Sequence, residues 1–214
     1  MAGELPITLL EYERLFRTIH GILLNEEGTP SRACLFFAIL GAAALNRHHR
    51  FKSPAQVVSG AAAHNLRTPT NACLVLGASE NDELVSDKDH FHCWIEVEGW
   101  IVDFSAPLFD QMLDRGKDDT PVPPLMFQKR ALSTASMLER LGSPGAYLHI
   151  GNQDLTFYLL DHFSKKRAHG DLVEICTQWY TRPPKKIRPA LGIGNAKGEV
   201  SEVPLSSIRI AGAW

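Results

Sequence analysis

The chain has 214 residues, of which 44% are hydrophobic and 21% are charged, and this composition is typical of a globular protein. Its 22 basic and 24 acidic side chains leave a net charge of −2, which excludes the strong basic bias that binds nucleic acids and anionic membranes. The length suits a single domain over residues 1–214, and we expect neither a nucleic-acid nor a membrane partner.

The first part of the chain is predicted to be helical. Residues 7–24 carry apolar side chains at helical spacing, which predicts an amphipathic helix. Gly28-Thr29-Pro30-Ser31 then interrupts the pattern, and Thr29 or Ser31 can serve as the N-cap of a second helix. This helix runs through CLFFAILGAAALNRH and is apolar on every side, so we expect it to be buried. Its small residues, Gly41 to Ala44, allow a neighbour to approach closely.

The pattern changes to short strands from Ala55 onward. Residues 55–66 and 71–79 are predicted as two strands joined by a turn, and the polar residues 79–89 as a loop. For the second half we expect a surface loop at 110–124, helices at 133–141 and 152–166, a helix or strand at 172–180, and a hairpin near 194–198. Helices followed by a meander of strands predict an α+β fold with a largely antiparallel sheet.

Residues 90–107, HFHCWIEVEGWIVDFSAP, are predicted to form a β-hairpin with unusual chemistry on one face. Because strand residues alternate, His92, Trp94 and Glu96 point one way, and Cys93 with its alternating partners points the other way. The natural turn is Glu98-Gly99, with glycine supplying a positive φ.

An even-membered turn decides where the hairpin places its acidic residue. It pairs Val97 with Trp100 and Trp94 with Asp103, so Asp103 lies diagonal to His92 on the same face. A carboxylate in that place can accept a hydrogen bond from the imidazole, fix its tautomer and stabilise the imidazolium. An odd turn with a bulge would send Asp103 to the opposite face.

Cys34 is the candidate nucleophile that such a histidine requires. It lies near the start of the buried helix, where the helix dipole and unpaired N–H groups favour a thiolate. A nearby protonated histidine would lower the pKa of the thiol further, and the N–H groups can stabilise an oxyanion. The alternative is a buried cysteine that acts as a small hydrophobic residue.

The four cysteines, Cys34, Cys73, Cys93 and Cys176, are widely spaced and form no CxxC pair. This pattern favours reduced thiols rather than a disulfide framework, and we expect Cys73, Cys93 and Cys176 to serve packing. Acidic residues interrupt the first segment, so we expect no secretory signal, and no apolar run reaches the length of a membrane span. The expected location is the cytoplasm.

The order of these residues resembles the transglutaminase-like and arylamine N-acetyltransferase-like branch of the papain-like cysteine hydrolases. The matching residues are Cys34 with its apolar helix, then HCWIEV at 92–97 and WIVD at 100–103. VVSGAAA also resembles the strand that precedes the hairpin in that branch. The resemblance covers residues 28–107, with 108–214 as a family-specific elaboration, and a bacterial family of unknown function within the branch is a closer match.

This resemblance implies the fold, the chemistry and the roles of the site residues. The implied fold packs a nucleophile-bearing buried helix on a mainly antiparallel sheet. Cys34 is implied as nucleophile, His92 as general base and acid, and Asp103 as the residue that orients His92. The implied reaction is acyl transfer through a thioester, on a small-molecule or peptide amide or ester, with no cofactor and no metal. The acyl acceptor and the oligomeric state stay open.

Three further residues are expected to contact the substrate. Trp94 and Glu96 share the face of His92, although Glu96 can equally serve a structural hydrogen bond. Papain-like enzymes often carry a side-chain oxyanion donor a few residues before the cysteine. In this chain that stretch departs from the pattern, and Asn25 is the residue there that can donate.

Two other interpretations stay open at this stage. His90, His92 and Glu96 have the ligand spacing of cupins and would share one strand face, with His64 as a fourth ligand. The two helices that open the chain and Asp103, which stands where cupins carry glycine, argue against it. The third interpretation is a non-catalytic binding module of the same fold.

Overall fold

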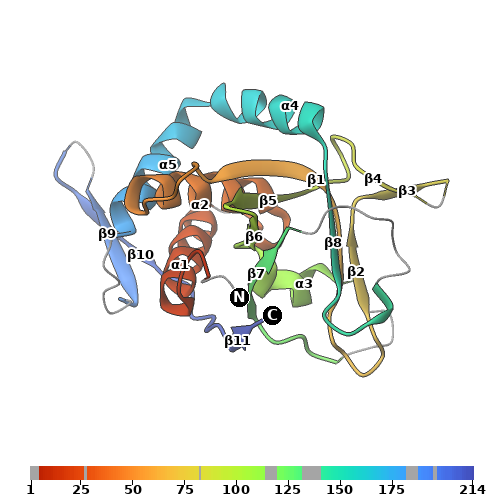
Figure 1. The fold of residues 1–214 in the computed structure, drawn as a ribbon. Helices are drawn as coiled ribbons and strands as arrows, with labels where there is room; N and C mark the ends of the chain where they lie inside the picture. Colours follow the sequence, from red (N-terminus) through yellow and green to blue (C-terminus); the bar gives the residue numbers. More distant parts are fainter. Residues whose placement is uncertain are drawn as a thin grey trace.

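The computed structural model describes residues 5–26, 28–81, 83–113, 120–131, 141–181, 188–194 and 197–214. It is an α+β structure in which helices pack against a mainly antiparallel sheet, as the sequence predicts (Figure 1). The helices are α1 (Leu9–Asn25), α2 (Cys34–His48), α3 (Phe109–Met112), α4 (Gln153–Ser164) and α5 (Arg167–Trp179), with the short 3₁₀ helices η1 (Pro30–Arg32) and η2 (Ala106–Leu108).

Seven strands of the described residues form one sheet, in the order β11-β7-β6-β5-β1-β2, with β8 paired to β1. The pairs are antiparallel except β11 with β7, which is parallel. Two small hairpins, β3–β4 and β9–β10, lie outside this sheet. The strands are β1 (Gln56–Asn65), β2 (Cys73–Leu76), β3 (Ala78–Glu80), β4 (Glu83–Val85), β5 (His92–Val97), β6 (Trp100–Asp103), β7 (Leu125–Arg130), β8 (Tyr147–Gly151), β9 (Ala190–Gly194), β10 (Val200–Pro204) and β11 (Gly212–Ala213).

Helix α1 begins with a reciprocal cap and anchors the sheet near Asp103. The Thr8 hydroxyl accepts from the Glu11 N–H, and the Glu11 carboxylate accepts from the Thr8 N–H. The apolar face of the helix is buried from Tyr12 to Leu23, and Tyr12 is fully enclosed, whereas Leu9, Leu10 and Leu24 of the predicted stripe are exposed. The Tyr12 hydroxyl donates a hydrogen bond to the main-chain carbonyl of Asp103, which ties the end of β6 to the helix layer.

The middle of helix α2 is buried, but its first turn, Cys34 to Phe36, is half-buried and Asn46 and Arg47 are exposed, so the predicted burial on every side holds only in part. The helix packs against β5, α5 and α1. At Gly41 an added Cβ would lie 2.6 Å from the Phe104 ring and 2.9 Å from Ile95 Cδ1, so the small residue permits the close approach to the sheet. The expected cap at Thr29 or Ser31 is wrong, because η1 intervenes and the N-cap of α2 is Ala33, whose side chain makes no capping bond.

The β5–β6 hairpin has the register that an even turn requires. Val97 pairs with Trp100 and Ile95 with Val102, around the two-residue turn Glu98-Gly99. Both turn residues have positive φ, 49° and 76°, which is the pattern of a type I′ turn. The same register carries Asp103 to the position opposite Trp94, diagonal to His92, so the sequence-based placement of Asp103 is confirmed.

The sheet separates two apolar clusters. Cys93, Ile95 and Val97 face the larger cluster, which includes the apolar residues of α1 and α2. Trp94 faces a second cluster with Ile101, Phe109, Phe127 and the C-terminal Trp214. His92 and Asp103 share the face of Trp94, because β5 and β6 alternate in register, and both side chains are buried there.

The structure corrects some of the local expectations from the sequence and confirms others. Residues 79–89, expected as a loop, contain the strand β4 and the end of β3. The segment 172–180 is helical and belongs to α5, and 152–166 is helical as expected. Residues 133–140 of the helix expected at 133–141, and part of the loop expected at 110–124, lie outside the described residues. The hairpin expected near 194–198 corresponds to β9 and β10, which pair on either side of it.

The second half of the chain contributes directly to the main sheet. Strands β7, β8 and β11 pair with β6, β1 and β7, respectively. The segment beyond residue 107, expected as an elaboration, is therefore structurally continuous with the part that carries the motifs. None of the described helices combines the length and apolar character that spanning a bilayer requires.

Replacing Gly41 by alanine tests the close contact between α2 and the sheet. The added methyl group would meet Phe104 and Ile95, so we expect a loss of about 1–3 kcal/mol in the free energy of unfolding. Gly170→Ala in α5 is the matched control, because nothing lies within 4 Å of its Cβ position. It should stabilise the protein by up to about 1 kcal/mol through helix propensity. Urea denaturation of both variants measures the difference, and equal effects would contradict the packing.

Candidate active site

The core of the site is a buried bond between His92 and Asp103. His92 Nε2 lies 2.7 Å from Asp103 Oδ2, and both side chains are at most 2% exposed. The other carboxylate oxygen, Oδ1, accepts hydrogen bonds from the Ser105 N–H at 2.8 Å and the Ser105 hydroxyl at 2.7 Å. The carboxylate is thus held from both sides, and it fixes the ring so that Nδ1 of His92 is the nitrogen left for a reacting group.

This pairing favours the charged form of the imidazole. Burial alone disfavours an imidazolium, but the charge of Asp103, its hydrogen bond and the neighbouring Cys34 outweigh burial and raise the pKa of His92 to about 10. Burial likewise opposes the Asp103 carboxylate, yet the charge and hydrogen bonds of His92 and the bonds from Ser105 lower its pKa. The two groups are therefore a charged pair at neutral pH.

Cys34 is the first residue of α2, and its half-buried side chain interacts with Cys93 and His92. The hydrogen bond from Cys93 has the largest effect on its pKa, burial opposes it, and the bond and charge of His92 add to the lowering. Together they bring the pKa of Cys34 to about 5. Burial and the neighbouring Cys34 raise the pKa of Cys93, whose sulfur lies 3.1 Å from Ser59 Oγ. At neutral pH the site holds a thiolate beside an imidazolium.

The start of α2 offers hydrogen-bond donors at the nucleophile. The first intrahelical bond of α2 is from the Phe37 N–H to the Ala33 carbonyl, so the N–H groups of residues 34–36 have no acceptor within the helix. The Ala33 side chain makes no capping bond either. Donors with this geometry next to a thiolate can bind the negative oxygen of a tetrahedral intermediate.

The three residues expected to contact the substrate have different environments in the structure. Trp94 is 1% exposed and donates its indole N–H to Glu96 Oε1 at 3.0 Å, so it packs behind the site rather than facing solvent. Asn25 is exposed at the end of α1 and its amide bonds to Glu26, which gives no support to the expected oxyanion role. Glu96 is half-buried and lines a cavity.

The cavity beside Glu96 lies between the first half of β1, the end of β5 and helix α4. Its volume is about 680 Å³, and its walls combine apolar and neutral polar side chains with the carboxylate of Glu96. The lining residues are Gln56, Val57, Val58, Glu96, Gly151, Asn152, Gln153, Thr156, Phe157 and Leu160. Glu96 stands four residues along β5 from His92, about 13 Å at the rise of a strand.

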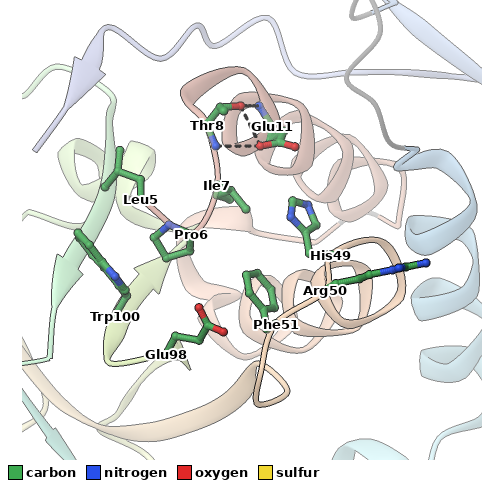
Figure 2. Close-up of a pocket in the computed structure, with 10 residues that line it drawn as sticks. All are labelled: Leu5, Pro6, Ile7, Thr8, Glu11, His49, Arg50, Phe51, Glu98 and Trp100. Carbon is green, nitrogen blue, oxygen red and sulfur yellow. Dashed lines mark hydrogen bonds between the residues drawn. The ribbon is translucent and has the colours of Figure 1, made fainter. Parts of the chain in front are cut away.

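A second hollow, of about 340 Å³, lies at the turn end of the hairpin (Figure 2). Its lining comes from the hairpin (Glu98 and Trp100), the segment that follows α2 (His49, Arg50 and Phe51) and the residues around the start of α1. His92 stands at the opposite end of β5, and neither His92, Cys34 nor Asp103 lines this hollow. It is therefore separate from the triad.

The cupin-like ligand set expected as a rival is not assembled. His90 lies before β5 begins, its side chain is exposed, and its Nδ1 is 3.3 Å from the Asp87 carboxylate. It therefore does not share the buried strand face of His92, and Glu96 is already bonded to Trp94. The expectation that His90, His92 and Glu96 share one face is wrong, because the strand starts two residues later than a three-ligand face would need.

Two buried histidines next to the triad were missed as a group by the sequence analysis. His64 of β1 and His149 of β8 lie on the same sheet face as His92, with ring centroids 5.0 Å apart. Burial lowers the pKa of both, and the His92 charge adds to it; the pKa of His149 falls to about 3. Strand alternation would have placed His64 on the same face as Gly60, which pairs with His92. His149 gave no such signal, because its strand was not predicted.

The remaining cysteines are free, as predicted, although their environments differ from expectation. Cys73, expected in packing, is exposed, because it is the first residue of the short edge strand β2. Cys93 is buried but contacts Cys34 in addition to packing. Cys176 is buried in the helix layer, as expected, and burial raises its pKa.

The similarity of the chain to known proteins extends over almost its whole length. The model of the family DUF2026, described as a protein of unknown function, matches residues 8–214. A crystal structure described as that of genomics APC5867 is similar with a TM-score of 0.82 and 28% sequence identity, and the alignment covers 100% of both chains. No curated protein matches the chain. The segment 108–214 is thus part of what these proteins share.

Alkylation of Cys34 by iodoacetamide tests the thiolate directly. In a Cys73→Ser background, which removes the exposed thiol, the rate should rise with pH through a midpoint near 5 and then stay level through neutral pH. His92→Gln removes the bond and the charge that lower the pKa of Cys34, so the midpoint should move upward. Mass spectrometry of the labelled peptide gives the rates. A midpoint near 9 in the parent protein would contradict the ion pair.

Proposed function

Because the chain belongs to the family DUF2026, whose description assigns no activity, we propose from the site itself that it is a cysteine-nucleophile acyl-transfer enzyme. The observation that carries the proposal is the convergence of Cys34, His92 and Asp103 from α2, β5 and β6. The triad is buried on the acid side and half-open on the thiol side. This difference in exposure suits a nucleophile that must contact the substrate and a carboxylate that only orients the histidine.

The first half of the reaction uses the preformed ion pair. The Cys34 thiolate attacks the carbonyl carbon of an amide or ester, and the carbonyl π electrons move to oxygen. The N–H groups at the start of α2 bind that oxyanion. As the tetrahedral intermediate collapses, the bond to the leaving amine or alkoxide breaks, and the His92 imidazolium gives it a proton through Nδ1. The product is a thioester on Cys34 with a neutral His92.

The second half transfers the acyl group from Cys34 to an acceptor. Neutral His92 removes a proton from water or an amine as that group attacks the thioester carbon. The thiolate leaves, and the site returns to the thiolate–imidazolium pair. Asp103 stays ionised throughout and holds the ring in place, since its pKa lies below the usual range and Ser105 fixes its other oxygen.

The order of the elements supports a relationship with the transglutaminase-like branch of the papain-like superfamily. The sequence resemblance implies a buried helix that starts at the nucleophile and antiparallel strands that carry the histidine and then the acid. Helix α2, strand β5 and strand β6 follow that order in this chain. We propose this narrower fold assignment on the same grounds as the reaction.

The proposed substrate is a small-molecule or peptide amide or ester. The cavity of about 680 Å³ beside Glu96 is large enough for a group some distance from the reacting carbonyl. The Glu96 carboxylate would favour a neutral or cationic group there. Free cysteines and a low-pKa thiolate support a reducing compartment such as the cytoplasm.

Hydrolysis of p-nitrophenyl acetate, an activated ester, tests the proposal without knowledge of the natural substrate. We expect acetyl transfer to Cys34, detected as a mass increase of one acetyl group on its peptide. His92→Ala should lower the acylation rate about 10²–10⁴-fold, because the charged partner and the proton donor are lost. Cys73→Ser is the control and should leave the rate unchanged. Acetylation that persists in Cys34→Ala, or an unchanged rate in His92→Ala, would overturn the proposal.

A further inference from the structure

Beside the triad, three side chains that can bind a metal ion lie close together on the face of the sheet that carries the aromatic cluster. The nearest donor atoms of His64, Asp103 and His149 all lie within 4.8 Å of one another, and all three residues are buried. The sheet register places them there. Ala62, two residues before His64 on the same strand face, pairs with His149, so the two histidines are diagonal neighbours across β1 and β8.

The two imidazoles are unusual in having no polar partner. His64 is fully buried and His149 is 8% exposed. Within the described part of the chain, none of their four ring nitrogens makes a hydrogen bond. Leaving a buried polar atom unpaired costs about 1–3 kcal/mol, so two such rings side by side indicate a ligand that satisfies them.

Asp103 has capacity for one more interaction. A carboxylate offers about four acceptor positions. Oδ1 takes two hydrogen bonds from Ser105, and Oδ2 takes one from His92, which leaves one position on the carboxylate for a group on the side of His64 and His149. Ligating carboxylates commonly keep such additional hydrogen bonds, since these fix the orientation of the ligand.

Aromatic rings enclose the three donors. The His64 ring lies 4.6 Å from the Phe109 ring and 5.1 Å from the Phe127 ring, measured between centroids, and the Trp94 ring lies 4.7 Å from His149. These rings restrict access of bulk water, and in such a surrounding a charge is stabilised mainly by the atoms that bind it.

We propose that His64, His149 and Asp103 form a binding site for one divalent first-row transition-metal ion. Two imidazole nitrogens and one carboxylate oxygen are ligands that suit Zn²⁺, Fe²⁺ and Co²⁺, whereas Mg²⁺ and Ca²⁺ require mostly oxygen. Three protein ligands leave further coordination positions for water or a small anion.

A single buried water molecule is the competing occupant, and the imidazole tautomers decide how well it fits. In the tautomers that turn both imidazole lone pairs toward Asp103, three acceptors face the centre, whereas an N–H turned inward would donate to a water oxygen. One water molecule has two hydrogens and satisfies two of the three. A metal ion satisfies all three at once.

This site differs from the metal set weighed on sequence grounds, and it departs from the sequence-based expectation of no metal. His64 belonged to that set only as a further ligand, and His90 and Glu96 take no part here. The proposal does not depend on acyl transfer, although the site shares Asp103 with the triad. A Cys34→Ala variant removes the nucleophile without touching any of the three ligands, so the two proposals can fail separately.

The test is titration of the full-length, chelator-treated protein with Co²⁺ and with Zn²⁺. Visible absorption should report one Co²⁺ bound per chain, and calorimetry one Zn²⁺, in the parent protein and in Cys34→Ala alike. His149→Ala should weaken Zn²⁺ binding roughly 100-fold or more, because loss of a ligand costs at least as much as loss of its hydrogen-bond partner. His149→Gln keeps the volume and serves if the alanine variant does not fold.

His162→Ala and His90→Ala are the matched controls, since both histidines are exposed, and they should leave binding unchanged. The proposal is overturned if the folded parent protein binds no stoichiometric metal, which would assign the space to water alone. It is also overturned if binding survives in folded His149→Gln, or if binding disappears in Cys34→Ala or His90→Ala.

Discussion

The hydrogen bond between His92 Nε2 and Asp103 Oδ2 is the interaction on which the rest of the site depends. It exists because a two-residue turn with positive φ at Glu98 and Gly99 fixes an even register between β5 and β6. A slip of one residue would turn Asp103 to the helix side of the sheet. The same bond leaves Nδ1 of His92 for Cys34 and holds the imidazole charged, which in turn favours the thiolate at the start of α2.

Asp103 takes part in two chemically different groups of residues, the triad with Cys34 and His92 and the cluster with His64 and His149. Through its bond to His92 it supports the thiolate–imidazolium pair, and its carboxylate also lies close to two neutral histidines that lack polar partners among the described residues. Several elements fix its position, because Ser105 holds one oxygen and the Tyr12 hydroxyl bonds to its main-chain carbonyl. A substitution at Asp103 would therefore affect both groups, and variants at Cys34 and His149 are needed to study them separately.

The sequence was sufficient where short-range rules apply and insufficient where distant strands meet. Alternation along β5 and the Glu98-Gly99 turn predict the placement of His92 and Asp103, and a uniformly apolar helix predicts the burial of the middle of α2. No local pattern reveals that β8 pairs with β1, so the meeting of His149 with His64 could not be foreseen. The roles expected for Asn25 and Trp94 rested on proximity in sequence or on a shared face, and neither contains information about exposure.

The most direct test of the account is the charge state of His92, observed by NMR of the ¹⁵N-labelled imidazole. We predict that His92 is an imidazolium through neutral pH, that it loses its proton only near pH 10, and that its Nε2–H is bonded to Asp103. Replacement of Cys34 by serine should shift that transition to lower pH, because the neighbouring thiolate is lost. A neutral imidazole at pH 7 in the parent protein would contradict the ion pair and the acyl-transfer chemistry built on it.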